Sequence, residues 1–184
     1  MPRILRLTLA LLLMLGLGAA MTDDANAMDP ENTLYLDTQY GRVVIQLRPD
    51  LAPIHVARVK ELTRQGFYDG IIFHRVIGGF MAQTGDPDGT GTGGSGKNLP
   101  AEFSKEPFVR GTIGAARTSD PNSADSQFFI CFARASHLDG QYTVWGQVTE
   151  GMQFIGKIAR GEPPAKPDKI LKMQVAADAD KAKK

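Results

Sequence analysis

Short runs of apolar residues, many of them alternating with polar ones and rich in β-branched and aromatic side chains, recur along the chain after residue 32. Such runs are typical of β-strands. They predict eight strands, at 33–38, 42–47, 71–77, 80–84, 112–116, 127–132, 142–148 and 169–175. Helical spacing is confined to a stretch opened by Pro53 and ended by Gly66, and to residues 151–159. This order favours an antiparallel barrel over a parallel α/β sheet.

The first 27 residues have the features of a secretory signal. Arg3 and Arg6 give a positive start, an apolar stretch follows at 7–17, and Ala25 and Ala27 frame a cleavage site. The apolar stretch is shorter than the roughly 20 residues of a spanning helix. Cleavage after Ala27 is therefore expected, with an uncleaved anchor as the alternative.

The rest of the chain has the length of one domain. We expect a polar lead-in at 28–32, a folded domain at 33–176 and a disordered polar tail at 177–184. The net charge of +1 gives no argument for a nucleic-acid or anionic membrane partner. The single cysteine, Cys131, cannot form an internal disulfide and is expected as a small buried hydrophobe. An exported chain poor in cysteine suits a bacterial periplasm.

An arginine lies inside the apolar stretch 71–77, where a buried strand is expected. Because strand side chains alternate, Arg75 should share one face with Phe73 and Ile77. Either its stem covers apolar surface at a strand edge, or its guanidinium is held at the rim of an apolar pocket. The pattern alone leaves both interpretations open.

Residues that suit such a pocket lie just downstream. Phe80, Met81 and Phe129 are apolar, and Gln83 and Gln127 carry amides that can fix a polar ligand. An apolar pocket with a few oriented polar groups is typical of a small-ligand or peptide site.

The motifs around these residues resemble the cyclophilins, the peptidyl-prolyl cis/trans isomerases. They are FHRVI at 73–77, GFM at 79–81 followed by Gln83 and Gly85–Asp86, the glycine-rich 89–94, SQFFI at 126–130, LDG at 138–140, GFYDG at 66–70 and VWGQV at 144–148. The resemblance runs from about residue 33 to 175. The ordered set is specific, although any one motif would not be.

The resemblance implies a closed eight-stranded antiparallel barrel with a helix at each end and a substrate groove on its outer face. It implies isomerisation of Xaa-Pro bonds in unfolded or extended polypeptides, which assists folding, without a cofactor or a metal. Arg75 takes the catalytic position. The positions that bind substrate are Phe80, Met81, Gln83, Arg117, Gln127, Phe129, Leu138 and Tyr142. A monomer is expected.

Three positions depart from the family pattern. Arg117 stands where asparagine is common, and there the backbone, more than the side chain, is expected to pair with substrate. Tyr142 replaces a common histidine. His137 stands where many eukaryotic members carry a tryptophan that helps to bind cyclosporin, so weak cyclosporin binding is expected. Trp145 is expected to be part of the barrel structure, and Glu102 to pack between core and loop.

Other features of the sequence suggest different functions less strongly. The segment 91–97 fits the G-x-x-x-x-G-K phosphate loop, but Asn98 stands where Ser or Thr is needed and Pro100 prevents a helix from following at once. The three histidines lack metal-ligand spacing. His55 is expected at the surface, and His74 in the core with a backbone hydrogen bond. A non-catalytic chaperone module using the same groove remains the main alternative, and a lipocalin-like barrel is disfavoured because bulky side chains should fill it.

Overall fold

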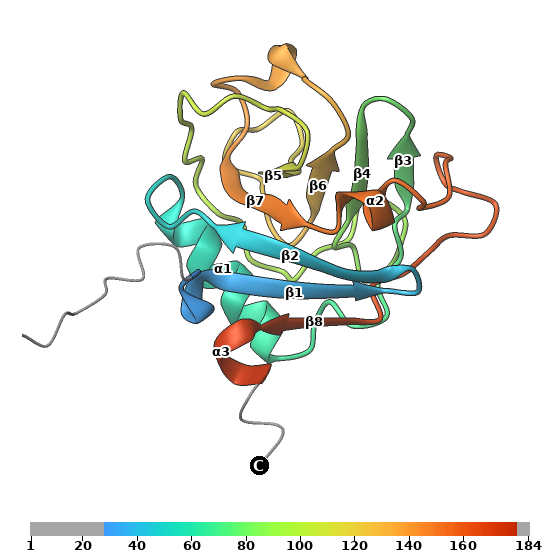
Figure 1. Ribbon diagram of the computed structural model, residues 1–184. Helices are drawn as coiled ribbons and strands as arrows, with labels where there is room; N and C mark the ends of the chain where they lie inside the picture. The colour runs from blue at the N-terminus through green and yellow to red at the C-terminus, as the bar shows by residue number, and fades with distance from the viewer. Residues whose placement is uncertain (1–27, 180–184) are drawn as a thin grey trace, which may run out of the picture.

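The computed structural model describes residues 28–179 and places them around one antiparallel sheet (Figure 1). Its strands pair in the order β3-β4-β6-β5-β7-β2-β1-β8. They are β1 (Thr33–Thr38), β2 (Gly41–Leu47), β3 (Arg75–Ile77), β4 (Met81–Thr84), β5 (Thr112–Ala115), β6 (Phe128–Cys131), β7 (Val144–Glu150) and β8 (Lys172–Val175). The helices are η1 (Pro30–Asn32), α1 (Pro53–Arg64), η2 (Ser136–Leu138), α2 (Met152–Ile155) and α3 (Ala176–Ala179). The predicted eight antiparallel strands are confirmed.

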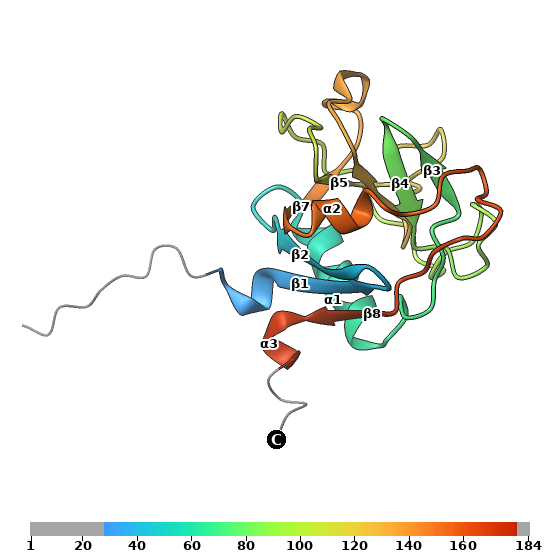
Figure 2. The same ribbon diagram turned by 45° about the vertical axis from the view of Figure 1, so that its right-hand side comes forward.

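The sheet is curled but open. Figures 1 and 2 show β1, β2 and β8 running side by side across the lower part of the molecule, while β3 and β4 stand upright beyond them. The edge strands β3 and β8 share no ladder. The segments that precede them meet at one bridge, Ile72–Lys169, where the backbone N–H of Phe73 donates to the carbonyl of Asp168 at 2.8 Å. The closed barrel that we expected is therefore not confirmed.

The strand that carries Arg75 is shorter than predicted. Residues 71–74 leave the ladder with β4 and turn toward the segment before β8, so β3 keeps only three residues. Phe73 is fully buried in the same cluster as Val76, whereas Arg75 is partly exposed. The prediction that Phe73 and Arg75 share a face was wrong, because regular alternation begins only at Arg75.

The inner face of the curled sheet and the buried sides of α1 and α2 form one apolar cluster, here called the inner core. Helix α1 packs against β7 and β8, and the short α2 packs against β2. Trp145 is almost fully buried here and meets Phe128 edge-on at 5.3 Å, as its predicted structural role requires. Large side chains thus fill the concave side of the sheet.

Helix α1 is capped from a distant loop. Its N-cap residue, Ala52, has no side chain that can accept a hydrogen bond. Glu102 takes this role, since its carboxylate accepts from the backbone N–H groups of Ile54 at 3.0 Å and His55 at 2.9 Å. The same carboxylate lies 2.6 Å from Nδ1 of His55. The expected surface position of His55 was wrong, because this contact holds the ring in a buried place.

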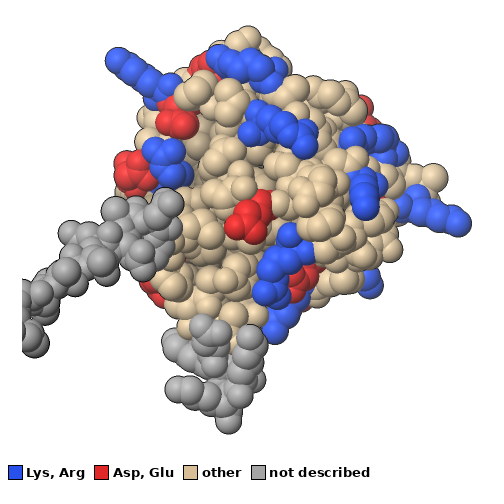
Figure 3. All heavy atoms as spheres, in the orientation of Figure 1, with Lys and Arg blue, Asp and Glu red and all other residues tan. Residues whose placement is uncertain are grey.

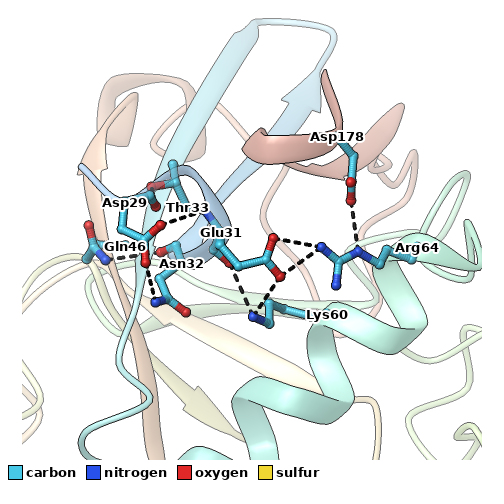
Figure 4. Close-up of polar contacts among 8 residues, drawn as sticks. All are labelled: Asp29, Glu31, Asn32, Thr33, Gln46, Lys60, Arg64 and Asp178. Atoms are coloured by element: carbon cyan, nitrogen blue, oxygen red, sulfur yellow. Dashed lines mark hydrogen bonds and ion pairs between the residues drawn. The ribbon is translucent and has the colours of Figure 1, made fainter. Parts of the chain in front are cut away.

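Ion pairs fasten the two ends of the described chain to α1 (Figure 4). Glu31 of η1 contacts Lys60 at 3.1 Å and Arg64 at 2.8 Å, and these cations lower the pKa of its carboxyl, Arg64 most strongly. Arg64 also pairs with Asp178 at 2.8 Å. Residues 177–179, where a disordered tail was predicted, belong to the helical turn α3, and residues 180–184 lie outside the described part. The predicted signal, residues 1–27, lies outside it as well.

Charges of both signs are interspersed over the face shown in Figure 3, with uncharged surface between them. This agrees with the near-neutral net charge of the chain. Within residues 28–179, none of the helices combines the length and the apolar character that a membrane crossing requires.

His74, next to Arg75, is buried without a hydrogen-bond partner on either ring nitrogen among the described residues. The predicted backbone hydrogen bond is absent there. Burial lowers the pKa of His74 below its ordinary value of 6.5 and outweighs the opposing charge of Asp86. The folded chain therefore holds a neutral ring at pH values where an exposed ring would take up a proton.

This burial makes stability depend on pH. Because the folded pKa is lowered, the unfolded chain binds the extra proton, and the free energy of unfolding should fall as the pH drops below 6.5 toward the lowered pKa. We expect His74→Gln to lose this contribution. Urea unfolding of both proteins at about pH 7.5 and about pH 5.5 should show the stability difference moving in favour of the variant at the lower pH. An unchanged difference would contradict a buried neutral ring.

Candidate functional site

The candidate site lies on the outer, convex face of the sheet. Strand β6 shows this best, because all four of its residues are buried. Phe128 and Ile130 belong to the inner core, whereas Phe129 and Cys131 belong to a second cluster on the opposite face. This second cluster, here called the outer cluster, consists of Met81, Phe108, Phe129, Cys131, Ala135, Leu138 and Val144. A sheet this small therefore has apolar surface on both sides.

The sheet register places four residues of the site in a row across neighbouring strands. Arg75 of β3 is opposite Gln83 of β4, Gln83 is opposite Phe129 of β6, and Phe129 is opposite Gly114 of β5. Directly opposed residues project to the same face. Arg75 and Gln83, which are far from Phe129 in the sequence, thus lie on the same outer face as Phe129.

A chain of hydrogen bonds orients these groups. Nη1 of Arg75 lies 3.5 Å from Oε1 of Gln83, a long contact. Nε2 of Gln83 donates to Oε1 of Gln127 at 2.9 Å, and Nε2 of Gln127 donates to the carbonyl of Gly93 at 2.8 Å. The two amides are therefore fixed by partners at both ends, and Gln83 turns its oxygen toward the guanidinium.

A cavity of about 270 Å³ opens beside this row. Its lining residues are Arg75, Phe80, Met81, Gln83, Ala116, Arg117, Phe129, His137, Leu138 and Tyr142. Eight of the nine residues predicted for the site line this cavity. The ninth, Gln127, lines an adjoining cavity of about 320 Å³. Gln83, Ala116 and Arg117 line both cavities. The structure thus brings the predicted set together.

Phe129 forms the base of the first cavity and is held by other rings. It stacks on Phe108 at 5.7 Å and meets Tyr142 edge-on at 5.8 Å. Gly114 leaves room for it, since a Cβ there would lie 2.4 Å from the Phe129 ring and 2.6 Å from the Phe108 ring. Phe108, which stacks under Phe129 from the long loop before β5, was not predicted. No pattern in the sequence around Phe108 indicates this contact.

Arg117 forms the wall between the two cavities. Its guanidinium lies over the ring of Tyr142, 4.4 Å from the centroid. Nη1 donates to the carbonyl of Thr118 and Nη2 to that of Gln141, both at 2.8 Å. These contacts hold the side chain in place where it lines both cavities.

His137 also lines the cavity and contacts Phe80. Its ring centroid is 5.3 Å from that of Phe80, and the rings are tilted by 43°. It lines the cavity together with Leu138 of η2. The position singled out in the sequence for its departure from tryptophan is thus part of the site.

The glycine-rich loop beside the second cavity is ordered by two carboxylates. Asp86 accepts from the backbone N–H groups of Gly91 at 2.6 Å and Gly93 at 3.2 Å. Asp125 accepts from those of Gly96 at 2.8 Å and Lys97 at 3.2 Å. The N–H groups that a phosphate loop would offer to phosphate are directed at these side chains, which argues against the nucleotide interpretation of residues 91–97.

Burial disfavours the charged form of Asp86, yet its backbone hydrogen bonds prevail and lower its pKa. Cys131 is buried in the outer cluster, where burial raises the pKa of its thiol to about 12. Across residues 28–179, His, Cys, Asp and Glu side chains form no group of three or more suited to a metal ion. The lining of the cavity offers apolar surface, the amide of Gln83, the ring of His137, the hydroxyl of Tyr142 and the guanidinium groups of Arg75 and Arg117.

One contact of Arg75 was not foreseen. Its Nε donates to Oε2 of Glu162 at 2.7 Å. Glu162 is 87 residues away in the sequence, in the loop between α2 and β8. No local pattern could have indicated this pair.

Comparisons with known proteins agree with this geometry. Residues 33–175 match the model of the family described as cyclophilin type peptidyl-prolyl cis-trans isomerase/CLD. A probable peptidyl-prolyl cis-trans isomerase of Brucella suis biovar 1 (strain 1330) is 52% identical over 181 residues, which cover 89% of this chain and 91% of that relative. Peptidyl-prolyl cis-trans isomerase B of Bacillus subtilis (strain 168) is 40% identical over 124 residues, or 66% of this chain and 86% of that protein.

Solved structures show the same fold. The cyclophilin AquaCyp293 from Hirschia baltica superposes with a TM-score of 0.76 at 30% identity, covering 82% of this chain and 76% of that one. A Cryptosporidium parvum cyclophilin type peptidyl-prolyl cis-trans isomerase, crystallised in the presence of the dipeptide Ala-Pro, gives 0.72 at 28% identity, covering 78% and 98%. The chain therefore belongs to the cyclophilin family and is a peptidyl-prolyl cis-trans isomerase.

Proposed function

We propose that the cavity beside Arg75 binds the proline ring of an extended or unfolded polypeptide and that Arg75 accelerates rotation about the preceding bond. One observation carries this proposal: a partly exposed guanidinium lines the same cavity as the apolar side chains of Phe80, Met81, Phe129 and Leu138. Phe80, Met81, Phe129 and Leu138 suit an apolar ring, and Gln83 orients the arginine. The structure of a relative obtained with Ala-Pro supports a proline-containing ligand for this fold.

The chemistry needs no nucleophile, proton shuttle or cofactor. An Xaa-Pro bond exchanges between cis and trans in roughly tens to hundreds of seconds without a catalyst. The barrier reflects the partial double bond between carbon and nitrogen, and in the twisted state the nitrogen regains a lone pair. A guanidinium that donates to this nitrogen stabilises the twisted state more than either planar state. Arginine suits the role because its charge is permanent and its donors are rigid.

Gln127 and Arg117 extend the groove past the proline ring into the second cavity. An extended substrate can place its neighbouring residues there, with backbone pairing beside Arg117. We propose that the protein acts as a monomer.

We further propose that the chain is exported through residues 1–27 and acts in the periplasm as a folding catalyst. The charged start, apolar stretch and small-residue cleavage site support this. N-terminal sequencing of the protein recovered from the periplasmic fraction should begin at Met28, and an intact N-terminus would contradict cleavage.

The first test replaces the catalytic arginine. We expect Arg75→Ala to lower kcat/KM for a short Xaa-Pro peptide at least tenfold, about 1.4 kcal/mol of transition-state stabilisation. A coupled peptide assay measures the rate, and circular dichroism checks the fold. If the wild-type protein binds proline peptides but does not accelerate them, the chaperone module is the correct function.

The second test displaces the Phe129 ring by adding a methyl group at Gly114. A Cβ at position 114 would clash with the rings of Phe129 and Phe108, so Gly114→Ala should push Phe129 into the cavity. We expect weaker binding of proline peptides and a higher KM, measured by calorimetry and kinetics. The variant should still give a folded far-ultraviolet spectrum. Unchanged peptide affinity would show that Phe129 is not the base of the proline site.

The third test concerns cyclosporin. His137 offers less apolar area than a tryptophan against Phe80, so we expect a dissociation constant far weaker than nanomolar. His137→Trp should bind cyclosporin more tightly, as measured by inhibition of peptide isomerisation. Nanomolar affinity of the wild-type protein would refute the expectation.

A further inference from the structure

We infer that Glu162 is a positioning residue that orients the guanidinium of Arg75 for catalysis. This inference rests on the proposed role of Arg75. It goes beyond that role by assigning a function to the loop between α2 and β8, which contributes no residue to the lining of either cavity.

The first step is the distribution of partners around the guanidinium. Nε of Arg75 donates to Glu162 at 2.7 Å, and Nη1 faces Gln83 at 3.5 Å. Nη2 has no partner among the described residues. Because the guanidinium is planar and rigid, fixing Nε and Nη1 fixes the direction of Nη2 as well. The free nitrogen is then the donor left for substrate.

The backbone next to Glu162 is attached to β3, the strand that carries Arg75. The neighbouring Gly161 exchanges two backbone hydrogen bonds with Val76, at 2.8 Å and 3.0 Å. Val76 directly follows Arg75 and is 1% exposed. The backbone φ of Gly161 is 146°, a value that side chains disfavour, and it lets the chain turn immediately into Glu162. The carboxylate is thus delivered from a backbone fixed to β3 itself.

The Arg75–Glu162 pair acts through its geometry more than through its charge. The side chains of Arg75 and Glu162 are 40% and 53% exposed, so solvent screens their Coulombic attraction. The hydrogen bond from Nε of Arg75 to Glu162 still orients the guanidinium when the attraction is screened. The arginine also stays charged with or without a partner. Glu162 should therefore act mainly by supplying an acceptor in the right place.

Without that acceptor, the long arginine side chain samples more rotamers, and fewer of them point Nη2 at the substrate. The contact between Gln83 and Nη1 is long and cannot hold the group by itself. We expect Glu162→Ala to lower kcat about three- to fivefold, the range that an exposed ion pair supports, with little change in KM. Glu162→Gln keeps an acceptor oxygen and should restore most of the activity.

The experiment combines kinetics with a double-mutant cycle. The variants are Glu162→Ala, Glu162→Gln, Arg75→Ala and the double variant, with Glu150→Ala as a matched control at an exposed glutamate that has no ion pair among the described residues. In the Arg75→Ala background, Glu162→Ala should have no further effect on kcat. Glu150→Ala should behave as wild type. Thermal unfolding checks that each variant is folded.

Nuclear magnetic resonance provides a readout that a purely structural role would not move. The Nε–H resonance of Arg75, assigned by its loss in Arg75→Lys, should exchange slowly with water in the wild-type protein and in Glu162→Gln. It should exchange fast in Glu162→Ala. An unchanged kcat in Glu162→Ala, or an equal loss in both arginine backgrounds, would overturn the inference. If Arg75→Ala itself leaves the rate unchanged, the assigned role of Arg75 fails instead.

Discussion

The burial of strand β6 on both faces is the constraint on which the site depends. Phe128 and Ile130 fill the inner core, and Phe129 and Cys131 anchor the outer cluster. A strand with one solvent-exposed polar face would place no apolar side chains on the convex side of the sheet. Here the outer face carries enough apolar surface to bind an uncharged ring, and the same backbone that closes the core also fixes the base of the cavity.

The rest of the site is arranged by register. Because Gln83 lies opposite both Arg75 and Phe129, a single amide stands between the charged group and the apolar base. In the proposed mechanism the catalytic requirement is small: an apolar surface and one donor aimed at the right atom. Precision would then come from the groups that hold the arginine, Gln83 on one side and Glu162 on the other.

Local pattern was sufficient wherever neighbours in sequence are neighbours in space. Strand β1 was predicted with its observed bounds, and α1 began at Pro53 as expected. The site residues were identified through their resemblance to a family, and the structure brings them together. Prediction failed where segments distant in sequence determine the structure. Phe73 pairs with the backbone of the segment before β8, and His55 is buried by its contact with Glu102. Asp178, in the predicted tail, forms an ion pair with α1. The loop that delivers Glu162 is of the same kind.

A crystal structure of the protein with a short peptide containing Ala-Pro would test the central claim most directly. We expect the proline ring to lie against Phe129 in the cavity of about 270 Å³. We expect Nη2 of Arg75 to lie within about 3 Å of the proline nitrogen or the adjacent carbonyl oxygen. A proline ring bound in the adjoining cavity beside Gln127, with Arg75 making no contact to the peptide, would contradict it.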